Sequence, residues 1–140
     1  MHYFDASALV KRYVRERGSL LVRRLLSTGT GATSRLSEVE VASGIVRRAR
    51  EGALSTPQRD RVLAALADDL PALVIVELTP DMTIDARRLL LAHALRAGDA
   101  IQLASALYLG RHLARPLPFV AFDGRLTRAA AAEGLDVVTR

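Results

Sequence analysis

Short apolar runs alternate with longer helical segments along this chain, and this alternation limits the folds that it can adopt. The length of each run predicts a buried strand, and apolar residues three and four positions apart in the intervening segments predict helices. The predicted strands are 2–4 (HYF), 31–34 (GATS), 73–76 (LVIV), 118–122 (PFVAF) and 135–139 (LDVVT). The predicted helices are 8–15, 19–27, 36–50, 57–69, 81–95, 99–113 and 125–132.

Strands separated by helices favour parallel pairing, because each helix carries the chain back to the start of the next strand. We therefore expect an α/β fold, a three-layer α/β/α sandwich with a central, mostly parallel five-stranded sheet. The chain has 140 residues, of which 50% are hydrophobic, so it can bury one substantial core. No linker or internal repeat divides it, and residues 1–140 are predicted to form a single domain.

The composition limits the compartment and the partners. The sequence has no cysteine, which excludes disulfides and thiolate metal sites. No apolar run approaches the roughly 20 residues that a membrane-spanning helix needs, and the N-terminus has strand character, so we expect a cytoplasmic protein without a membrane partner. The net charge of +5 and the pI near 10.6 favour a polyanionic partner, although most individual arginines are expected only to solvate helix faces.

Several acidic residues are expected near one edge of the sheet. Asp5 follows the first predicted strand and Asp123 follows the fourth. Ligands of parallel sheets bind beyond the carboxyl ends of the strands, where both acids would lie. Asp99 begins a mostly apolar helix, and Glu40 lies in the first turns of the helix 36–50.

Helical spacing does not choose between Glu38 and Glu40. Both acids flank the same expected apolar stripe, one on each side. That stripe comprises Val39, Ala42, Val46 and Ala49.

Each acid alone has an ordinary structural interpretation, because acids at strand ends and in first helical turns often cap helices. Four carboxylates at one edge are harder to explain in this way, since they repel one another unless a cation lies among them. Such an all-oxygen set suits Mg²⁺ or Mn²⁺. Zinc fits poorly, because the three histidines are scattered and no cysteine is present.

Motifs of several other catalytic and cofactor sites are absent from the sequence. It contains neither GxxxxGK[ST] nor GxGxxG, which bind nucleotide phosphates, and it has no GxSxG motif. The sequence therefore does not indicate a nucleotide cofactor or a serine nucleophile.

Four segments with acidic residues follow one another along the chain: FDASALVKRY, TSRLSEVEVASGIVRR, LRAGDAIQLASAL and FVAFDGRLTRAAAAEGL. Together they resemble the PIN domain, and specifically the VapC-type ribonuclease toxins of toxin–antitoxin pairs. The similarity extends over essentially the whole chain.

The resemblance implies a metal-dependent endoribonuclease with one or two Mg²⁺ or Mn²⁺ ions, whose products carry a 5′-phosphate and a 3′-hydroxyl. The catalytic and metal-binding residues of the family map onto Asp5, Glu40, Asp99 and Asp123. The resemblance thus selects Glu40 over Glu38, because Glu40 holds the motif position before Val-Ala-Ser. Ser7 matches a residue that supports Asp5 through hydrogen bonds.

Two positions depart from the pattern of the family. Many relatives carry Thr or Ser two residues before the last aspartate, where this chain has Ala121. Some relatives carry another acid shortly after that aspartate, where this chain has GRLT. Both differences weaken the case for a second metal ion.

The resemblance also implies partners: an RNA substrate, a cognate VapB-type antitoxin that blocks the acidic site, and a second copy in a homodimer. Amphipathic helices within 8–27 and 36–69 are candidate surfaces for the antitoxin, although core packing also explains their apolar residues. Aromatic residues make up only 4% of the chain, which favours recognition of a structured RNA by shape and backbone. The candidate phosphate contacts nearest to the motifs are Arg12, Arg35, Arg96 and Arg125.

Two alternatives to this interpretation differ in what they require. A phosphohydrolase of the haloacid dehalogenase type also begins with a strand-end aspartate, but it needs Asp-x-Asp where this chain has Asp-Ala-Ser. A PIN-like module that binds RNA or protein without nuclease activity is the second alternative. The four acids argue against such a module, whereas Ala121 leaves it open.

Overall fold

The computed structural model describes residues 1–139, so Arg140, the last residue of the predicted domain, lies outside the described residues. The strands are β1 (His2–Phe4), β2 (Gly31–Ser34), β3 (Val74–Val76), β4 (Phe119–Val120) and β5 (Val137–Val138). The helices are α1 (Ala6–Tyr13), α2 (Ser19–Thr28), α3 (Leu36–Arg50), α4 (Thr56–Asp69), α5 (Pro80–Ala92), α6 (Ala97–Leu113) and α7 (Gly124–Ala132), with a 3₁₀ turn, η1 (Leu70–Ala72).

The strands form one parallel sheet in the order β3-β2-β1-β4-β5. In the centre, Tyr3 of β1 pairs with Ala32 of β2 and with Phe119 of β4. The chain builds one half of the sheet outward from β1 to β3 and then returns to build the other half from β4 to β5. The strand order therefore reverses between β1 and β4, which is where open parallel sheets bind ligands.

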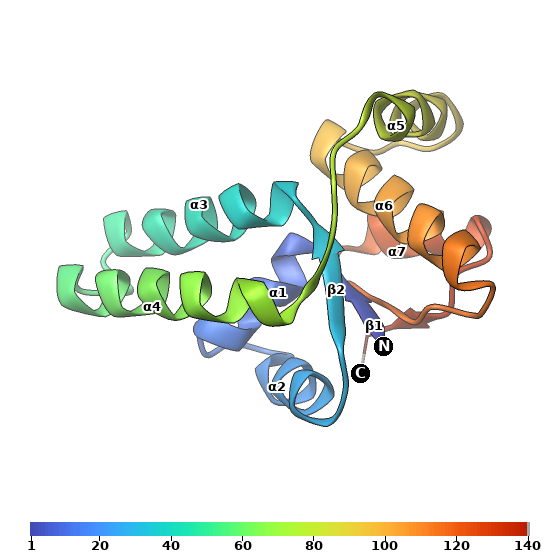
Figure 1. The fold of residues 1–140 in the computed structure, drawn as a ribbon. Helices are drawn as coiled ribbons and strands as arrows, with labels where there is room; N and C mark the ends of the chain where they lie inside the picture. The colour runs from blue at the N-terminus through green and yellow to red at the C-terminus, as the bar shows by residue number, and fades with distance from the viewer. Residues whose placement is uncertain (140) are drawn as a thin grey trace.

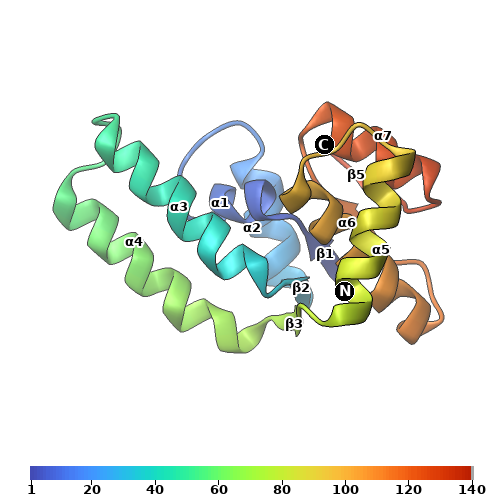
Figure 2. The same ribbon diagram turned by 90° about the horizontal axis from the view of Figure 1, so that it is seen from above.

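Helices cover both faces of the sheet and complete the expected three layers (Figures 1 and 2). On one face, α5, α6 and α7 pack against Tyr3 and Phe119. On the other face, α1, α2, α3 and α4 pack against Phe4 and Val120. Successive residues of β1 thus enter different cores, because side chains alternate across a strand.

α3 and α4 form an antiparallel pair that extends away from the sheet (Figures 1 and 2). Leu66 is the one fully buried residue of α4 within the described chain, and Val62 and Leu63 pack against the core while remaining partly exposed. The start of α4 is fixed by a capping box, in which the Ser55 hydroxyl accepts from the Gln58 amide and the Gln58 side chain accepts from the Ser55 amide.

Several boundaries differ from those predicted. α1 begins at Ala6 and not at residue 8, because the Asp5 carboxylate caps it by accepting a 2.8 Å hydrogen bond from the Ala8 amide. α5 ends at Ala92 and not at residue 95, because His93 is extended and Leu95 packs against the core. β4 and β5 are shorter than predicted, since each forms only two residue pairs with its neighbour.

The predicted apolar stripe of α3 was wrong at Val39, whereas Ala42 packs against the core as expected. Val39 is 68% exposed, whereas Val41, Gly44 and Ile45 are buried. The buried face of α3 also carries Ser37, which turns into the interior and hydrogen-bonds the Thr33 hydroxyl at 2.6 Å. Ser37, Val41, Gly44 and Ile45 are spaced so that they share this face, and it is this face that packs inward.

Among residues 1–139, no helix combines the length and the apolar character that crossing a membrane requires.

Candidate active site

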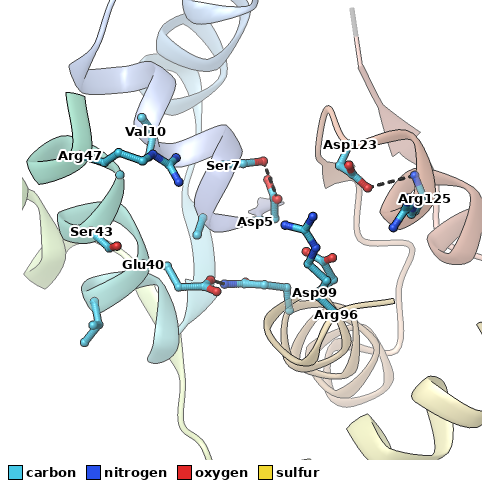
Figure 3. Close-up of a pocket in the computed structure, with 14 residues that line it drawn as sticks. Asp5, Ser7, Val10, Glu40, Ser43, Arg47, Arg96, Asp99, Asp123 and Arg125 are labelled. Atoms are coloured by element: carbon cyan, nitrogen blue, oxygen red, sulfur yellow. Dashed lines mark hydrogen bonds between the residues drawn. The ribbon is translucent and has the colours of Figure 1, made fainter. Parts of the chain in front are cut away.

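A pocket of about 650 Å³ lies beyond the carboxyl ends of β1 and β4, at the reversal of the strand order (Figure 3). The four acids predicted from the sequence line it and define what we call the acidic pocket: Asp5, Glu40, Asp99 and Asp123. They come from four different segments of the chain, and α3, α6 and the starts of α1 and α7 hold them. The tertiary structure thus brings together acids that are far apart in sequence.

Asp5 lies at the junction between β1 and α1. It is only 4% exposed. One carboxylate oxygen accepts from the Ala8 amide, and the other accepts from the Ser7 hydroxyl at 2.7 Å. The two bonds fix the orientation of a buried carboxylate that forms no ion pair within residues 1–139.

Asp123 and Asp99 lie at the starts of two helices. Asp123 caps α7, because one carboxylate oxygen accepts from the amides of Arg125 and Leu126 at 3.0 Å each. Asp99 lies in the first turn of α6 and is half-buried. Both carboxylates benefit from the positive end of a helix dipole, and both line the acidic pocket.

Glu40 extends from α3 toward α6 across the acidic pocket (Figure 3). Its carboxylate accepts a 2.9 Å hydrogen bond from the side-chain amide of Gln102. Glu38, the other acid that spacing allowed, points outward and pairs with Arg35 at 3.1 Å. Of the two, only Glu40 lines the pocket.

The electrostatics of the acidic pocket disfavour several negative charges at once. Burial, with a smaller contribution from the nearby charge of Asp99, raises the pKa of Asp5 to about 6. Burial and Asp99 likewise raise the pKa of Glu40. Burial raises the pKa of Asp99, and Asp123 adds to this effect, while Arg96 and Arg125 oppose it. Asp99 is therefore the acid whose charge couples to the other three.

The acidic pocket offers a divalent cation suitable ligands but does not yet enclose it. Within residues 1–139, no three acidic or histidine side chains stand close enough together to bind an ion directly. The donors are nevertheless all carboxylate oxygens, which Mg²⁺ and Mn²⁺ prefer. A cation among them would also offset the repulsion that Asp99 exerts on Asp5 and Glu40. The donor chemistry therefore fits such an ion, with some ligands reaching it through water.

Within residues 1–139, three arginines line the acidic pocket, and they differ in part from the four predicted. Arg96 and Arg125 line it as expected, with Arg96 pointing toward Asp5 and Asp99 (Figure 3). Arg47 is the third. None of these arginines forms an ion pair within the part of the chain that the structure describes.

The other two predicted arginines lie elsewhere and are already paired. Arg12 bonds Asp69 at 2.8 Å, and Arg35 bonds Glu38 and Glu77. Neither lines the acidic pocket. They were predicted because they lie near a motif in sequence, whereas Arg47 shares a helix face with Glu40, seven residues earlier. Helical periodicity would have found it.

Gln102, which contacts Glu40 from inside the protein, was not predicted from the sequence. Its position three residues after Asp99 places both on one side of α6 and was a usable signal. A glutamine within the apolar run of a helix expected to be mostly buried was a second signal, because buried amides need hydrogen-bond partners.

Comparisons with known proteins identify the family of this chain. The PIN domain family model matches residues 2–132. Ribonuclease VapC45 of Mycobacterium tuberculosis (strain CDC 1551 / Oshkosh) is 38% identical over 136 residues, which cover 96% of this chain and 92% of that protein. The chain therefore belongs to the PIN domain family, and the VapC45 ribonuclease is one of its curated relatives.

Solved structures with lower sequence identity share the fold. The crystal structure of Mycobacterium tuberculosis VapC20, described as a sarcin–ricin loop cleaving toxin, superposes with a TM-score of 0.69 at 17% identity, covering 96% of each chain. A toxin–antitoxin complex from Klebsiella pneumoniae gives a TM-score of 0.64 at 23% identity, covering 99% of this chain and 97% of that chain. Both confirm the predicted PIN-like α/β/α architecture.

Proposed function

We propose that this protein is a metal-dependent endoribonuclease toxin that hydrolyses RNA phosphodiester bonds. The observation that carries the proposal is the meeting of Asp5, Glu40, Asp99 and Asp123 in one pocket at the reversal of the strand order. The named activity of the VapC45 relative supports the ribonuclease assignment. We expect it to act in the cytoplasm on structured RNA.

In this proposal the four carboxylates hold one or two Mg²⁺ or Mn²⁺ ions, partly through water. A bound ion would lower the pKa of a water molecule and offset charge on the phosphate oxygens. Ser7 fixes the carboxylate of Asp5, and the backbone amides of α7 fix that of Asp123. These contacts reduce the reorganisation that ion binding requires, because two of the ligands are already oriented.

Arg47, Arg96 and Arg125 are the proposed contacts for the RNA backbone. Their guanidinium groups surround the acidic pocket from three elements and are free of protein carboxylates within the described residues. Guanidinium groups bind phosphate oxygens in a bidentate way. They would draw the polyanion over a pocket whose carboxylates alone would repel it.

The proposed protein partners are a VapB-type antitoxin and a second copy of this chain. The toxin–antitoxin complex among the structural neighbours supports the first partner. Val39 is a suitable contact for an antitoxin, because this exposed apolar residue lines the acidic pocket. For a homodimer, α5 offers Ile84 and Leu91, which are seven residues apart on one helix face and are both exposed.

The experiment that tests the proposed nuclease is cleavage of total cellular RNA by the purified protein, with cut sites mapped by sequencing of the RNA ends. Cleavage should require Mg²⁺ or Mn²⁺, stop with EDTA and leave 5′-phosphates. Asp5→Asn and Asp99→Asn should each abolish it while keeping the fold. Asp68→Asn is the matched control, because Asp68 is an exposed acid of α4 that does not line the acidic pocket.

Undiminished cleavage by both folded pocket variants would refute the assignment of the site. RNA binding without cleavage in either metal would instead favour the PIN-like binding module without nuclease activity.

A further inference from the structure

Two contacts from α6 meet the carboxylate of Glu40, which belongs to α3. The Gln102 amide nitrogen donates to Oε2 at 2.9 Å. The backbone of Gly98 approaches the other oxygen, Oε1. Gln102 and Gly98 lie one turn apart on the helix that also carries Asp99. One helix therefore presents an acid of its own, bonds one oxygen of a second acid and leaves room for the other.

A directed chain of buried hydrogen bonds fixes the orientation of the Gln102 amide. The Thr33 hydroxyl donates to the Phe4 carbonyl at 2.7 Å, so its single proton is used there. Ser37 must then donate to Thr33, and it accepts in turn from the Gln102 nitrogen at 2.8 Å. The Tyr3 hydroxyl donates to the Gln102 amide oxygen at 2.8 Å. The amide nitrogen is therefore the end that faces Glu40.

The residues of this hydrogen-bond network are buried, which makes the network rigid. Gln102 is 2% exposed, and Tyr3, Thr33 and Ser37 are buried as well. A reversed amide would direct its oxygen at the Glu40 carboxylate and leave the Tyr3 hydroxyl without an acceptor. Unpaired polar groups at this depth are costly, so the arrangement is strongly preferred.

Gly98 makes room for the other oxygen of Glu40. A Cβ atom at this position would collide with Oε1, although the backbone of Gly98 is ordinary helix that any residue can adopt. Backbone conformation therefore does not explain the glycine, whereas the space taken by Glu40 does. Because Oε1 is the end of a flexible side chain, a larger residue would displace the carboxylate and leave the fold intact.

We propose that Gln102 and Gly98 are positioning residues that hold the Glu40 carboxylate in the acidic pocket for ion binding. The inference deepens the proposed function and rests on it only in that the acidic pocket binds a divalent cation. Gln102 pulls one oxygen of Glu40 toward α6, and the missing side chain at Gly98 admits the other. α6 thus fixes the distance between Glu40 and Asp99.

The test measures Mn²⁺ binding to the metal-free protein by calorimetry, together with thermal unfolding. Gly98→Ala should weaken Mn²⁺ binding by about 10- to 100-fold, as the loss of residues that orient metal ligands does. It should not lower the unfolding temperature, because Ala favours a helix over Gly. Gly110→Ala is the matched control on the same helix, since its Cβ would meet only an ordinary contact with Leu117.

Gln102→Met should weaken Mn²⁺ binding as well. If the Gln102→Met variant unfolds, the Gly98→Ala variant still decides the test. Wild-type affinity in folded Gly98→Ala would overturn the inference, and the proposed nuclease would stand. Equal loss in Gly110→Ala would also overturn it. Absence of Mn²⁺ binding by the wild type would overturn the metal-dependent function together with the inference.

Discussion

At the scale of single residues, Asp5 shows how the acidic pocket lowers the stability of the metal-free fold. Its carboxylate is almost completely buried and lies near Asp99, and burial is the main cause of its raised pKa. Hydrogen bonds from Ser7 and Ala8 offset only part of this cost. The metal-free protein therefore maintains an unfavourable charge at the place where we propose an ion.

Replacing Asp5 with Asn should stabilise the metal-free protein at neutral pH. The rise of the Asp5 pKa from 3.8 to about 6 corresponds to about 3 kcal/mol of unfolding free energy. Because the folded state holds the proton more tightly, this contribution is present below pH 3.8 and is lost as the pH rises through about 6. The Asp5→Asn variant has no charge to lose and can still cap α1, so it should keep this contribution to the unfolding free energy at neutral pH.

Urea unfolding in EDTA at several pH values measures this difference, with Asp68→Asn as the control for an exposed acid. A variant that is less stable than the wild type at neutral pH would contradict the cost that we assign to Asp5.

Arg47 is the residue whose loss should separate RNA binding from the fold. Arg47→Ala should weaken binding of a structured RNA hairpin several-fold. It should also reduce the slope of the logarithm of the binding constant against the logarithm of the salt concentration by about one. Filter binding in an Asp99→Asn background avoids cleavage during the measurement. Arg50→Ala, an exposed position of the same helix outside the acidic pocket, should bind like the parent. Equal weakening in both variants would indicate general charge attraction and no specific contact.

At the scale of elements, α3 and α6 have different tasks. α6 is buried on most of its surface and carries Asp99, Gln102 and Gly98. α3 contributes Glu40 near its start, while its far half extends with α4 away from the sheet (Figure 2). The end of α3 and the start of α4 should therefore tolerate destabilisation that would damage the acidic pocket if it occurred in α6.

The cap of α4 tests this difference. Ser55→Ala removes the hydroxyl that accepts from the Gln58 amide and should cost about 1 kcal/mol of unfolding free energy. RNA cleavage at a temperature where the variant is folded should stay unchanged, because Ser55 lies outside the acidic pocket. Urea unfolding and a cleavage assay on the same preparation measure both effects. A large loss of cleavage without a loss of stability would show that α4 contributes to the reaction.

At the scale of the whole molecule, the parallel sheet decides which distant residues meet. Because the strand order reverses between β1 and β4, the chain segments after these strands diverge and leave space above the sheet edge. α3 and α6 close that space from opposite faces of the sheet (Figure 1). The acidic pocket is therefore a property of the complete fold, and an ion bound there should stabilise the fold as a whole.

Mn²⁺ should raise the unfolding temperature of the wild type, since a ligand that binds only the folded state stabilises it. The increase should be larger above the pKa of Asp5 than below it, because protons compete with the ion for the carboxylate. Differential scanning fluorimetry with EDTA as the reference measures the shift. Asp99→Asn should abolish the Mn²⁺-dependent rise of the unfolding temperature. An equal rise in that variant would show that the ion binds outside the acidic pocket.

The sequence alone determined the layers of this protein and the identity of its acids. Strand and helix periods depend on local geometry, so the alternating pattern predicted all five strands and placed most helix ends within two residues. Asp5, Asp99 and Asp123 were found because each follows a strand or begins a helix. Spacing left Glu38 and Glu40 equivalent, and only the resemblance to the PIN domain separated them.

The tertiary structure decided how α3 is rotated and what holds Glu40. Val39 and Val41 are equally apolar, and the face that enters the core is the one that carries Val41 together with Ser37, which hydrogen-bonds Thr33. Glu40 of the same helix contacts Gln102, a residue 62 positions away in sequence. Such pairings depend on the packing of α3 against α6 across the edge of the sheet. No local pattern encodes that packing, because it exists only when both helices are in place.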